Sequence, residues 1–405
     1  MKESRSTTYL LAAGSVTLAA LMVRYPDIAV QASFRGLEIW WKSVFPALFP
    51  FFVLSELMIG FGVVKFAGAL LEPIMRPLFR VPGIGGFVLM MGMISGFPAG
   101  ARMTARLYQE KKLSKIEAER LSSFTNFSNP LFLFSVTAVG FFGQIALGIV
   151  FAIAHYLSNL GVGLVMRYYK SEPPVQAVNK HRRMVTFGSA LDQMHHERMD
   201  NYQPFGKMLG DAVNSSVKTL LAVGGFISLF SMIYQLLAQV GIVSIVGLIL
   251  ERCFTLAGWS PSLGHALVPG LFELTIGAKQ IGQSAAPMIE RVVLVSALLG
   301  FCGFSIQAQA VSILSQAGLN VKPFLFGRLI QAAFSACLAL LLYHLLAIDA
   351  RLTTTAVTTF ARPINSYADS LFASGSLITA AVLVSFVALS LTRLFHQDSP
   401  KNGLK

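Results

Sequence analysis

Long apolar runs dominate the chain, and several of them are long enough to cross a lipid bilayer. Stretches without acidic or basic side chains, histidine aside, cover residues 7–23, 141–166, 220–240, 329–346 and 370–392. A helix of about 20 apolar residues spans the roughly 30 Å of bilayer hydrocarbon. The hydrophobic pattern therefore predicts an all-α polytopic membrane protein.

Two other apolar regions are interrupted by glycine, proline and small polar residues. The first break covers residues 95–102 and has a partner at 124–130, beyond a charged loop. The second break covers residues 273–279 and has a partner at 301–307. We expect broken or re-entrant helices at these places. Transporters built from two repeats bind substrate where such interrupted segments of the two halves face each other near the bilayer midplane.

The two broken regions correspond at one constant shift along the chain, without a gap. Gly100 meets Gly277, Ala101 meets Ala278, Arg102 meets Lys279, Phe124 meets Phe301, Phe127 meets Phe304 and Ser128 meets Ser305. Such grouped coincidences at a single shift predict an internal repeat.

The repeat divides the chain into five predicted parts. They are a transmembrane helix in residues 1–33, a first repeat in 34–166, a basic soluble linker in 167–207, a second repeat in 208–347, and an amphipathic segment with a final transmembrane helix in 348–405. No small-x-small cleavage site follows the first span cleanly, so we expect that span to be retained.

The charged loops of the two halves differ in their basic residues. Residues 102–120 carry six Lys or Arg, whereas residues 279–297 carry two. Because basic loops stay on the cytoplasmic side, the difference favours an inverted-topology repeat with one loop on each side of the membrane. We interpret residues 102–120 as a helical, water-exposed stretch.

Composition supports the membrane class and argues against several others. The chain has 54% hydrophobic and 13% charged residues, against about 25% charged in soluble domains. Cytoplasmic loops rich in Lys and Arg explain the net charge of +13, so we expect no nucleic-acid partner. Three separate cysteines define neither a disulfide framework nor a metal site. Neither a phosphate-binding loop nor a nucleophile elbow is present, so we predict no enzyme, catalytic residue, metal or cofactor.

Three ionisable residues lie at the breaks. Glu273 is a functional candidate because it sits among apolar neighbours; the alternative is a structural pair with Lys279 or Arg102. The two cations could attract or neutralise an anion. Alternatively, they are interfacial side chains that extend toward the lipid headgroups, an interpretation stronger for Arg102, which precedes a basic loop.

Uncharged polar residues form one cluster in each half. Asn126, Ser128 and Asn129 precede Pro130, and Ser305 and Gln307 are their counterparts. In hydrocarbon such groups need partners, so they either bind substrate or join helices by hydrogen bonds. The break glycines permit tight turns or close approach of a ligand, with helix packing as the alternative. The predicted substrate-binding residues are Gly96, Pro98, Gly100, Arg102, Asn126, Ser128, Asn129, Glu273, Gly277, Lys279, Ser305 and Gln307.

The motifs resemble a known family over residues 34–343. Phe45-Pro-Ala-Leu-Phe-Pro-Phe51, Gly96-Phe-Pro-Ala-Gly100 and Asn126-Phe-Ser-Asn-Pro130 are similar to the nucleoside-recognition or Gate domain, here in two copies. Together with the length and the linker position, they resemble the family of sporulation integral membrane proteins that includes YlbJ, also called SpoVV, of endospore-forming bacteria.

The resemblance implies a transporter related to concentrative nucleoside transporters. In that family the proposed cargo is dipicolinic acid, a small carboxylate moved across the outer forespore membrane from the mother cell. A transporter of nucleosides or another small metabolite, or a scaffold for spore-envelope assembly, are the alternatives. H⁺ or Na⁺ coupling, facilitated diffusion and an oligomer all remain open.

Overall fold

The computed structural model describes residues 5–170 and 187–348, and every regular element in those ranges is a helix. By length and composition, five of these helices could cross a membrane, or six if the helix pair Leu48–Gly60 and Val63–Phe79, bent by 82°, counts as one span. The all-α polytopic prediction is confirmed. The predicted C-terminal helix at residues 370–392 lies outside the described residues.

The first half begins with two helices at the N-terminus and continues with eight elements. Their bounds are α1 Arg5–Arg24, α2 Pro26–Ile39, η1 Trp40–Val44, α3 Phe45–Gly60, α4 Val63–Phe79, α5 Ile84–Ser95, α6 Ala99–Gln109, α7 Lys115–Phe124, the π-helix η2 Phe132–Phe141, and α8 Leu147–Met166.

The second half follows the linker helix and has seven elements of its own. Their bounds are α9 Phe187–Asp200 in the linker, then α10 Phe205–Gln239, α11 Ile242–Leu256, α12 Leu263–Phe272, α13 Leu274–Gly282, α14 Met288–Phe301, α15 Gly303–Gln316 and α16 Lys322–Leu345.

The elements of the two halves follow the same order. Helices α3 to α8 correspond one by one to α10 to α16, with η2 in the place of α15, and α7 and α14 both end at the matched phenylalanines Phe124 and Phe301. A glycine in the left-handed conformation precedes both α4 (Gly62) and α11 (Gly241), a conformation that glycine adopts without steric cost. The order of elements supports the predicted repeat, which stays a prediction as a domain division.

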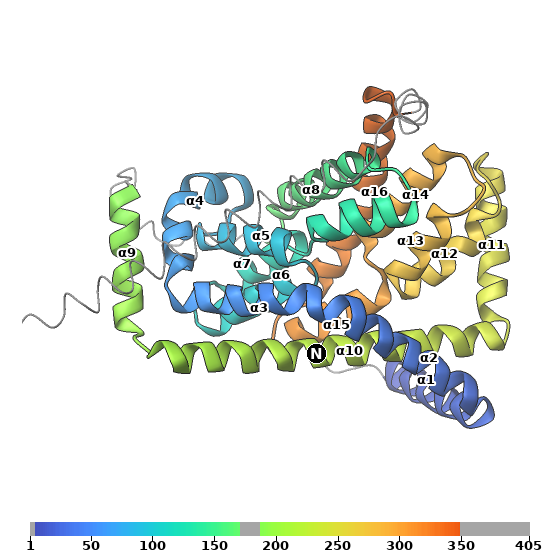
Figure 1. Ribbon diagram of the computed structural model, residues 1–405, viewed down its shortest axis with the longest axis horizontal. Coiled ribbons are helices and arrows are strands. Elements are labelled where there is room, and N and C mark those ends of the chain that lie inside the picture. The colour runs from blue at the N-terminus through green and yellow to red at the C-terminus, as the bar shows by residue number, and fades with distance from the viewer. Residues whose placement is uncertain (1–4, 171–186, 349–405) are drawn as a thin grey trace, which may run out of the picture. The chain divides into compact units, whose positions relative to one another are not determined.

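The first helices of the two halves, α3 and α10, pack side by side in opposite directions. Close to the start of α3, Trp40 packs with Val223 and Ile227 of α10. Just beyond the end of α3, Phe61 stacks on Phe205, the first residue of α10. Figure 1 shows the result: α3 leads into α4 at one end of this pair, and α10 leads into α11 at the other.

The contacts between the halves also come in exchanged pairs. Helix α6 packs against α15, and its counterpart α13 packs against η2; α7 packs against α16, and its counterpart α14 packs against α8. Helices α8 and α16, which close the two halves, pack against each other. This pattern is what a two-fold relation between the halves produces.

The structure corrects two expectations about the charged and apolar stretches of the first half. Residues 102–120 are only partly water-exposed: Gln109, Glu110 and Lys111 are exposed, but α6 and α7 bury Leu107, Glu119 and Arg120 among other residues. Glu119 accepts hydrogen bonds from the Tyr169 hydroxyl and the backbone N–H of Asn320. The prediction of water exposure failed for the buried charged residues because their hydrogen-bond partners lie far away in sequence. The predicted span 141–166 begins at Leu147, after η2 ends.

The linker region contains the helix α9, which has a solvated face. Asp192, His196 and Asp200 are exposed, and Ala190 is buried. Helix α9 packs against α4, and Arg198 lies 5.0 Å from the ring centre of Phe61. The helix therefore covers the end of the first half at which α3 turns into α4.

Candidate functional site: the junction of the broken helices

The first break interrupts the helix between α5 and α6 at three residues. Gly96 ends α5 with φ of 81°, a conformation that favours glycine, and the Phe97–Pro98 peptide bond is cis. A side chain at Gly96 would press on Asn129, and one at Gly100 would collide with the carbonyl of Thr125. Both glycines therefore permit close packing against the second interruption of the same half.

That second interruption is a non-helical segment between α7 and η2. It covers residues 125–129, and the helix resumes at Pro130. The Asn129 side chain accepts a hydrogen bond of 2.8 Å from the N–H of Phe132, and the N–H of Ser128 donates to Nε2 of His155 in α8 at 2.9 Å. Helix capping and interhelical bonding thus account for part of this polar cluster.

In the second half, the break between α12 and α13 lies at Glu273. Its side chain is buried and caps α13 by accepting a 2.9 Å hydrogen bond from the N–H of Ile276. The alternative of a structural pair with Lys279 or Arg102 is not observed: Lys279 is exposed, and Arg102 pairs with Glu56. Helices α12 and α13 cross at Gly270 and Gly277, where a side chain at Gly277 would collide with the Gly270 backbone. For Gly277, helix packing is the observed use.

The interruption between α14 and α15 lies at Cys302, in left-handed conformation with φ of 63°. The carbonyl of Phe301, at the end of α14, accepts a 2.9 Å hydrogen bond from the Gln307 side chain. Ser305 accepts a hydrogen bond of 3.4 Å from Gln309. Ser305, Gln307 and Gln309 are all buried, so this half also places a polar cluster at its break.

The two interruptions that follow α7 and α14 meet each other. Nδ2 of Asn126 lies 3.8 Å from Sγ of Cys302, and both residues are completely buried. Oδ1 of Asn126 has no hydrogen-bond partner in the described part of the chain. The structure thus joins the polar segment of the first half to the break of the second, at the matched ends of α7 and α14.

Arg328 of α16 lies at this junction and was missed by the sequence analysis. It is fully buried, and its guanidinium donates to the carbonyl of Asn126 at 3.1 Å, to the carbonyl of Ser123, and to the side chains of Asn159 at 3.1 Å and Gln331. Its position directly before an apolar run resembled an interfacial end of a span, which concealed it.

Helix α8 supplies the other polar side chains of the junction. Asn159 donates to the carbonyl of Asn126 at 3.3 Å, and Gln331 of α16 donates to the carbonyl of His155 at 3.3 Å. His155 and Asn159 are both fully buried. Their spacing of four residues within an apolar run was the available signal, since it places both on one helix face.

Arg102 belongs to an ion-pair cluster and does not extend toward lipid headgroups. Its side chain is 12% exposed, pairs with Glu56 of α3 at 2.6 Å, and donates to the Ser215 hydroxyl of α10 at 2.7 Å. It also lies 5.1 Å from the ring centre of Phe52. Arg102 therefore forms a largely buried ion pair within the protein, and its charge is already compensated by Glu56.

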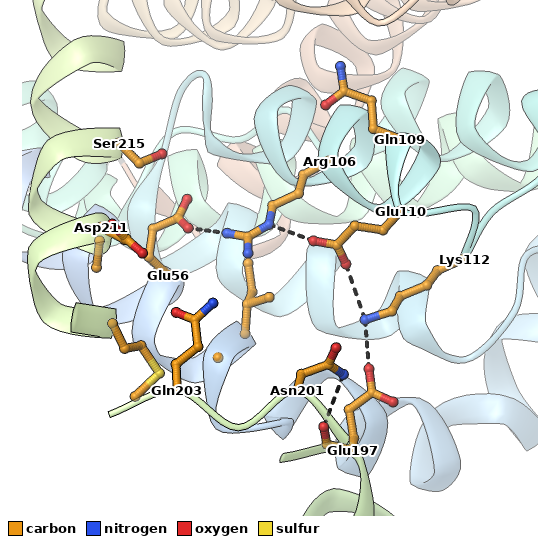
Figure 2. A pocket seen from close by; sticks show the side chains of 14 residues that line it. Glu56, Arg106, Gln109, Glu110, Lys112, Glu197, Asn201, Gln203, Asp211 and Ser215 are labelled. Carbon is orange, nitrogen blue, oxygen red and sulfur yellow. Dashed lines mark hydrogen bonds and ion pairs between the residues drawn. The ribbon is translucent and has the colours of Figure 1, made fainter. Parts of the chain in front are cut away.

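A cavity of about 820 Å³ opens beside this cluster, between α3, α6 and the region of α9 and α10. Figure 2 shows a continuous series of ion pairs along it: Arg106 lies between Glu56 and Glu110, and Lys112 lies between Glu110 and Glu197 of α9. We call these five residues the ionic ladder.

The electrostatics of the ladder differ from those of the junction. Burial alone would raise the pKa of Glu110, but hydrogen bonding and charge from Arg106 and Lys112 outweigh it and lower that pKa. Burial likewise opposes the charge of Lys112, but Glu197 and Glu110 raise its pKa. With Asp211 added, carboxylates outnumber the cations lining the cavity, which makes it a poor receptor for an anion.

No group of three or more His, Cys, Asp or Glu side chains that could hold a metal ion occurs in residues 5–170 and 187–348. Cys302 is buried, whereas Cys253 and Cys337 are exposed, and all three are free thiols. The polar groups of the junction are amides, backbone carbonyls, an imidazole and one guanidinium. This chemistry suits the binding of a polar or charged small molecule.

The fold and its junction define a polytopic integral membrane protein with broken helices. A family model described as nucleoside recognition, or Gate, matches residues 41–146. The chain is 48% identical over 346 residues, 85% of its own length and 84% of the relative's, to the sporulation integral membrane protein YlbJ of Bacillus subtilis. The chain belongs to the family of this protein.

A more distant similarity covers less of the chain. An uncharacterized protein of Alkalihalophilus pseudofirmus is 28% identical over 158 residues, 38% of this chain and 33% of that relative. No solved structure matches the chain. The family and the Gate match are consistent with a role in membrane transport or sporulation.

Proposed function

We propose that the protein is a membrane transporter of a small anionic metabolite, with its substrate site at the junction of the broken helices. The observation that carries the proposal is the meeting of Asn126 and Cys302, which joins the interruptions of the two halves in a fully buried polar region. Transporters with two repeats use such interrupted helices for substrate binding and move one repeat against the other to alternate access.

The opposite directions of α3 and α10 and the exchanged helix contacts support an inverted repeat. A two-fold relation gives the molecule two similar arrangements, with the junction reached from one side in one and from the other side in the other. In the described conformation the junction is closed, since Asn126, Cys302 and Arg328 are all buried. We take it as an occluded or resting state.

Dipicolinic acid is the first cargo to test. The resemblance to the YlbJ family points to it, and transport would then cross the outer forespore membrane. The Gate match, described as nucleoside recognition, favours a nucleoside as the second candidate. Nucleosides are neutral, so the two cargoes differ in whether the site must supply a positive charge. Coupling to H⁺ or Na⁺, or an oligomeric assembly, would be compatible with either cargo.

The test is uptake of radiolabelled dipicolinate into liposomes that contain the purified full chain. We expect saturable uptake that uridine does not inhibit and that the double variant Asn129→Ala, Gln307→Ala reduces. The variant Arg252→Gln, at an exposed position of α11, serves as the control. Uridine uptake with no dipicolinate uptake would favour the nucleoside candidate. No uptake of either by correctly folded protein would overturn the proposal and favour a scaffold.

A further inference from the structure

Arg328 carries a charge that no counter-ion in the structure compensates. Its side chain is 0% exposed. No carboxylate among residues 5–170 and 187–348 forms an ion pair with it. Arg102, the other arginine beside a break, pairs directly with Glu56. Burying a charge without a partner of opposite charge is strongly unfavourable, so an isolated buried guanidinium indicates a role beyond packing.

The partners that Arg328 does have are all neutral oxygens. Two are backbone carbonyls at the end of α7, those of Ser123 and Asn126, and two are the side-chain amides of Asn159 and Gln331. A carboxylate adds the attraction of opposite charge to the hydrogen bond, and its two oxygens fit the guanidinium fork. An anion that reached this point would therefore replace weaker partners with a stronger one.

Two polar atoms beside these bonds have no partner in the described part of the chain. They are Nε of Arg328 and Oδ1 of Asn126, both on fully buried side chains. Unsatisfied buried polar atoms are uncommon in native proteins. The guanidinium thus has an unused donor next to the point where the two breaks meet. Such a donor is expected in a site that binds an acceptor group of a ligand.

We propose that Arg328 is the anion receptor of the transport site and binds a carboxylate of the cargo when the junction opens. The proposal rests on the proposed function and adds the residue that recognises the charge. It also connects binding to movement: Arg328 holds the carbonyl of Asn126, and the Asn126 side chain contacts Cys302 of the other half. A carboxylate that takes over the guanidinium releases this segment from α16.

The other cations near the breaks are less suitable. Arg102 is neutralised by Glu56 beside a cavity in which carboxylates are in excess. Lys279 is exposed on α13, whereas Asn126 and Cys302, where the two breaks meet, are fully buried. The attraction of an anion, which was one of the two alternatives for these residues, is better explained by Arg328 of α16.

The first experiment measures ligand binding without transport. Full-length protein in detergent is heated with and without dipicolinate, and with pyridine-2,6-dicarboxamide, its neutral analogue. We expect dipicolinate alone to raise the melting temperature of the wild type. Arg328→Gln should lose this rise, Arg328→Lys should keep part of it, and Arg252→Gln should keep all of it. The loss corresponds to binding weakened by roughly tenfold or more, since hydrogen bonds to charged groups contribute about 1.5–3 kcal/mol.

A second measurement on the wild type covers the case that Arg328→Gln does not fold. Hydrogen exchange of peptides containing residues 121–129 and 324–331 should change on addition of dipicolinate and not on addition of the dicarboxamide. An exchange response confined to α6 or α13, or an undiminished melting rise in Arg328→Gln, would overturn the assignment. If dipicolinate binding depends on Arg328 but the protein transports nothing, the assignment of Arg328 holds and the transporter proposal fails. If Arg328→Gln transports normally, the transporter proposal holds and the assignment of Arg328 fails.

Discussion

Asn126 and Cys302 lie 3.8 Å apart, Nδ2 to Sγ, and belong to different halves of the chain. Each follows the helix that ends at one of the matched phenylalanines, Phe124 or Phe301. Because the Asn126 carbonyl is also bonded to Arg328 and Asn159, we expect a change at one break to affect the other. The predictions below test this arrangement and its surroundings.

Replacing Asn126 by Asp should place a carboxylate of the protein itself at the anion receptor. The new carboxylate would lie beside the Arg328 guanidinium, which already bonds to the carbonyl of the same residue, and would compensate its charge. We expect a folded protein whose thermal stability is equal to or above that of the wild type, but whose dipicolinate uptake is lost. Melting curves and liposome uptake on the same preparation check this. A variant that takes up dipicolinate normally would show that the cargo does not use this charge.

The crossing of α12 and α13 should not tolerate a side chain. A methyl group at Gly277 would collide with the backbone of Gly270, which cannot rotate away as a side chain can. We expect Gly277→Ala to lower stability by about 1–3 kcal/mol, the range for overpacking. Gly225→Ala is the matched control in α10, because nothing lies within 4 Å of its added methyl. Equal melting temperatures for the two variants would contradict the close crossing.

Removing the charge of Glu56 should destabilise the protein strongly, because this one carboxylate pairs with two arginines. Glu56 pairs with both Arg102 and Arg106, and its side chain is 11% exposed. Loss of one member of a largely buried pair costs about 3–5 kcal/mol, because the remaining charge is left uncompensated. We expect Glu56→Gln to lower the melting temperature strongly, and Glu56→Gln with Arg102→Met to recover part of the loss. Glu38→Gln, which breaks an exposed pair with Lys42, should change stability by less than about 1 kcal/mol.

The docking of α9 should depend on pH and salt through Lys112. The lowered pKa of Glu110 means that its stabilising contribution is complete above its ordinary value of 4.5 and is lost as the pH falls through the lowered value. The raised pKa of Lys112 means that its contribution is complete below 10.5 and is lost as the pH rises through the raised value. The ladder is therefore complete between these limits.

Proteolysis within residues 187–200 measures that docking directly. Cleavage should be slowest near neutral pH and faster in strongly acidic buffer. It should also accelerate at high salt, which screens partly exposed charges, and in Lys112→Met, which loses the pair with Glu197. Lys111→Met is the control, because its side chain takes part in none of the ion pairs of the ladder. Identical cleavage rates for the two variants would mean that packing against α4 alone holds α9.

Thiol labelling should report the opening of the junction. In a variant with Cys253→Ser and Cys337→Ser, only the buried Cys302 remains among the three cysteines. A membrane-permeant maleimide should label it slowly at rest, and dipicolinate should change the rate if cargo opens or closes the junction. A rate that is fast and insensitive to cargo would contradict the buried position of Cys302.

The sequence predicted the helical class, the breaks and the shift between them because these depend on local composition. Glycine and proline interrupt a helix wherever they occur, and an apolar run of sufficient length spans a bilayer irrespective of its neighbours. The matched ends of α7 and α14 follow directly from the repeated residues. The roles of Asn126 and Gln307 as buried groups at the breaks were predicted from the same pattern.

The predictions failed where a residue's environment depends on partners distant in sequence. Arg102 looked interfacial until Glu56 and Ser215 were placed beside it, and Arg328 looked like the end of a span until α7 and α8 surrounded it. Neither pairing leaves a trace in spacing or composition. Glu273 was recognised as important, but its capping role was not predicted. An acidic residue three positions before a free helical N–H can cap the helix, which is a local feature of the sequence.

The length of α10 indicates where the cavity lies relative to the membrane. Its 35 residues extend over about 50 Å, whereas bilayer hydrocarbon is about 30 Å thick. The uncharged part lies in residues 220–239, so the earlier part, with Asp211 and Ser215 at the cavity, extends past the hydrocarbon. We therefore expect the ionic ladder to contact the aqueous phase on one face of the membrane. A reagent that cannot cross lipid will reach it from that face alone, which turns the cavity into a marker for the orientation of the protein in a vesicle.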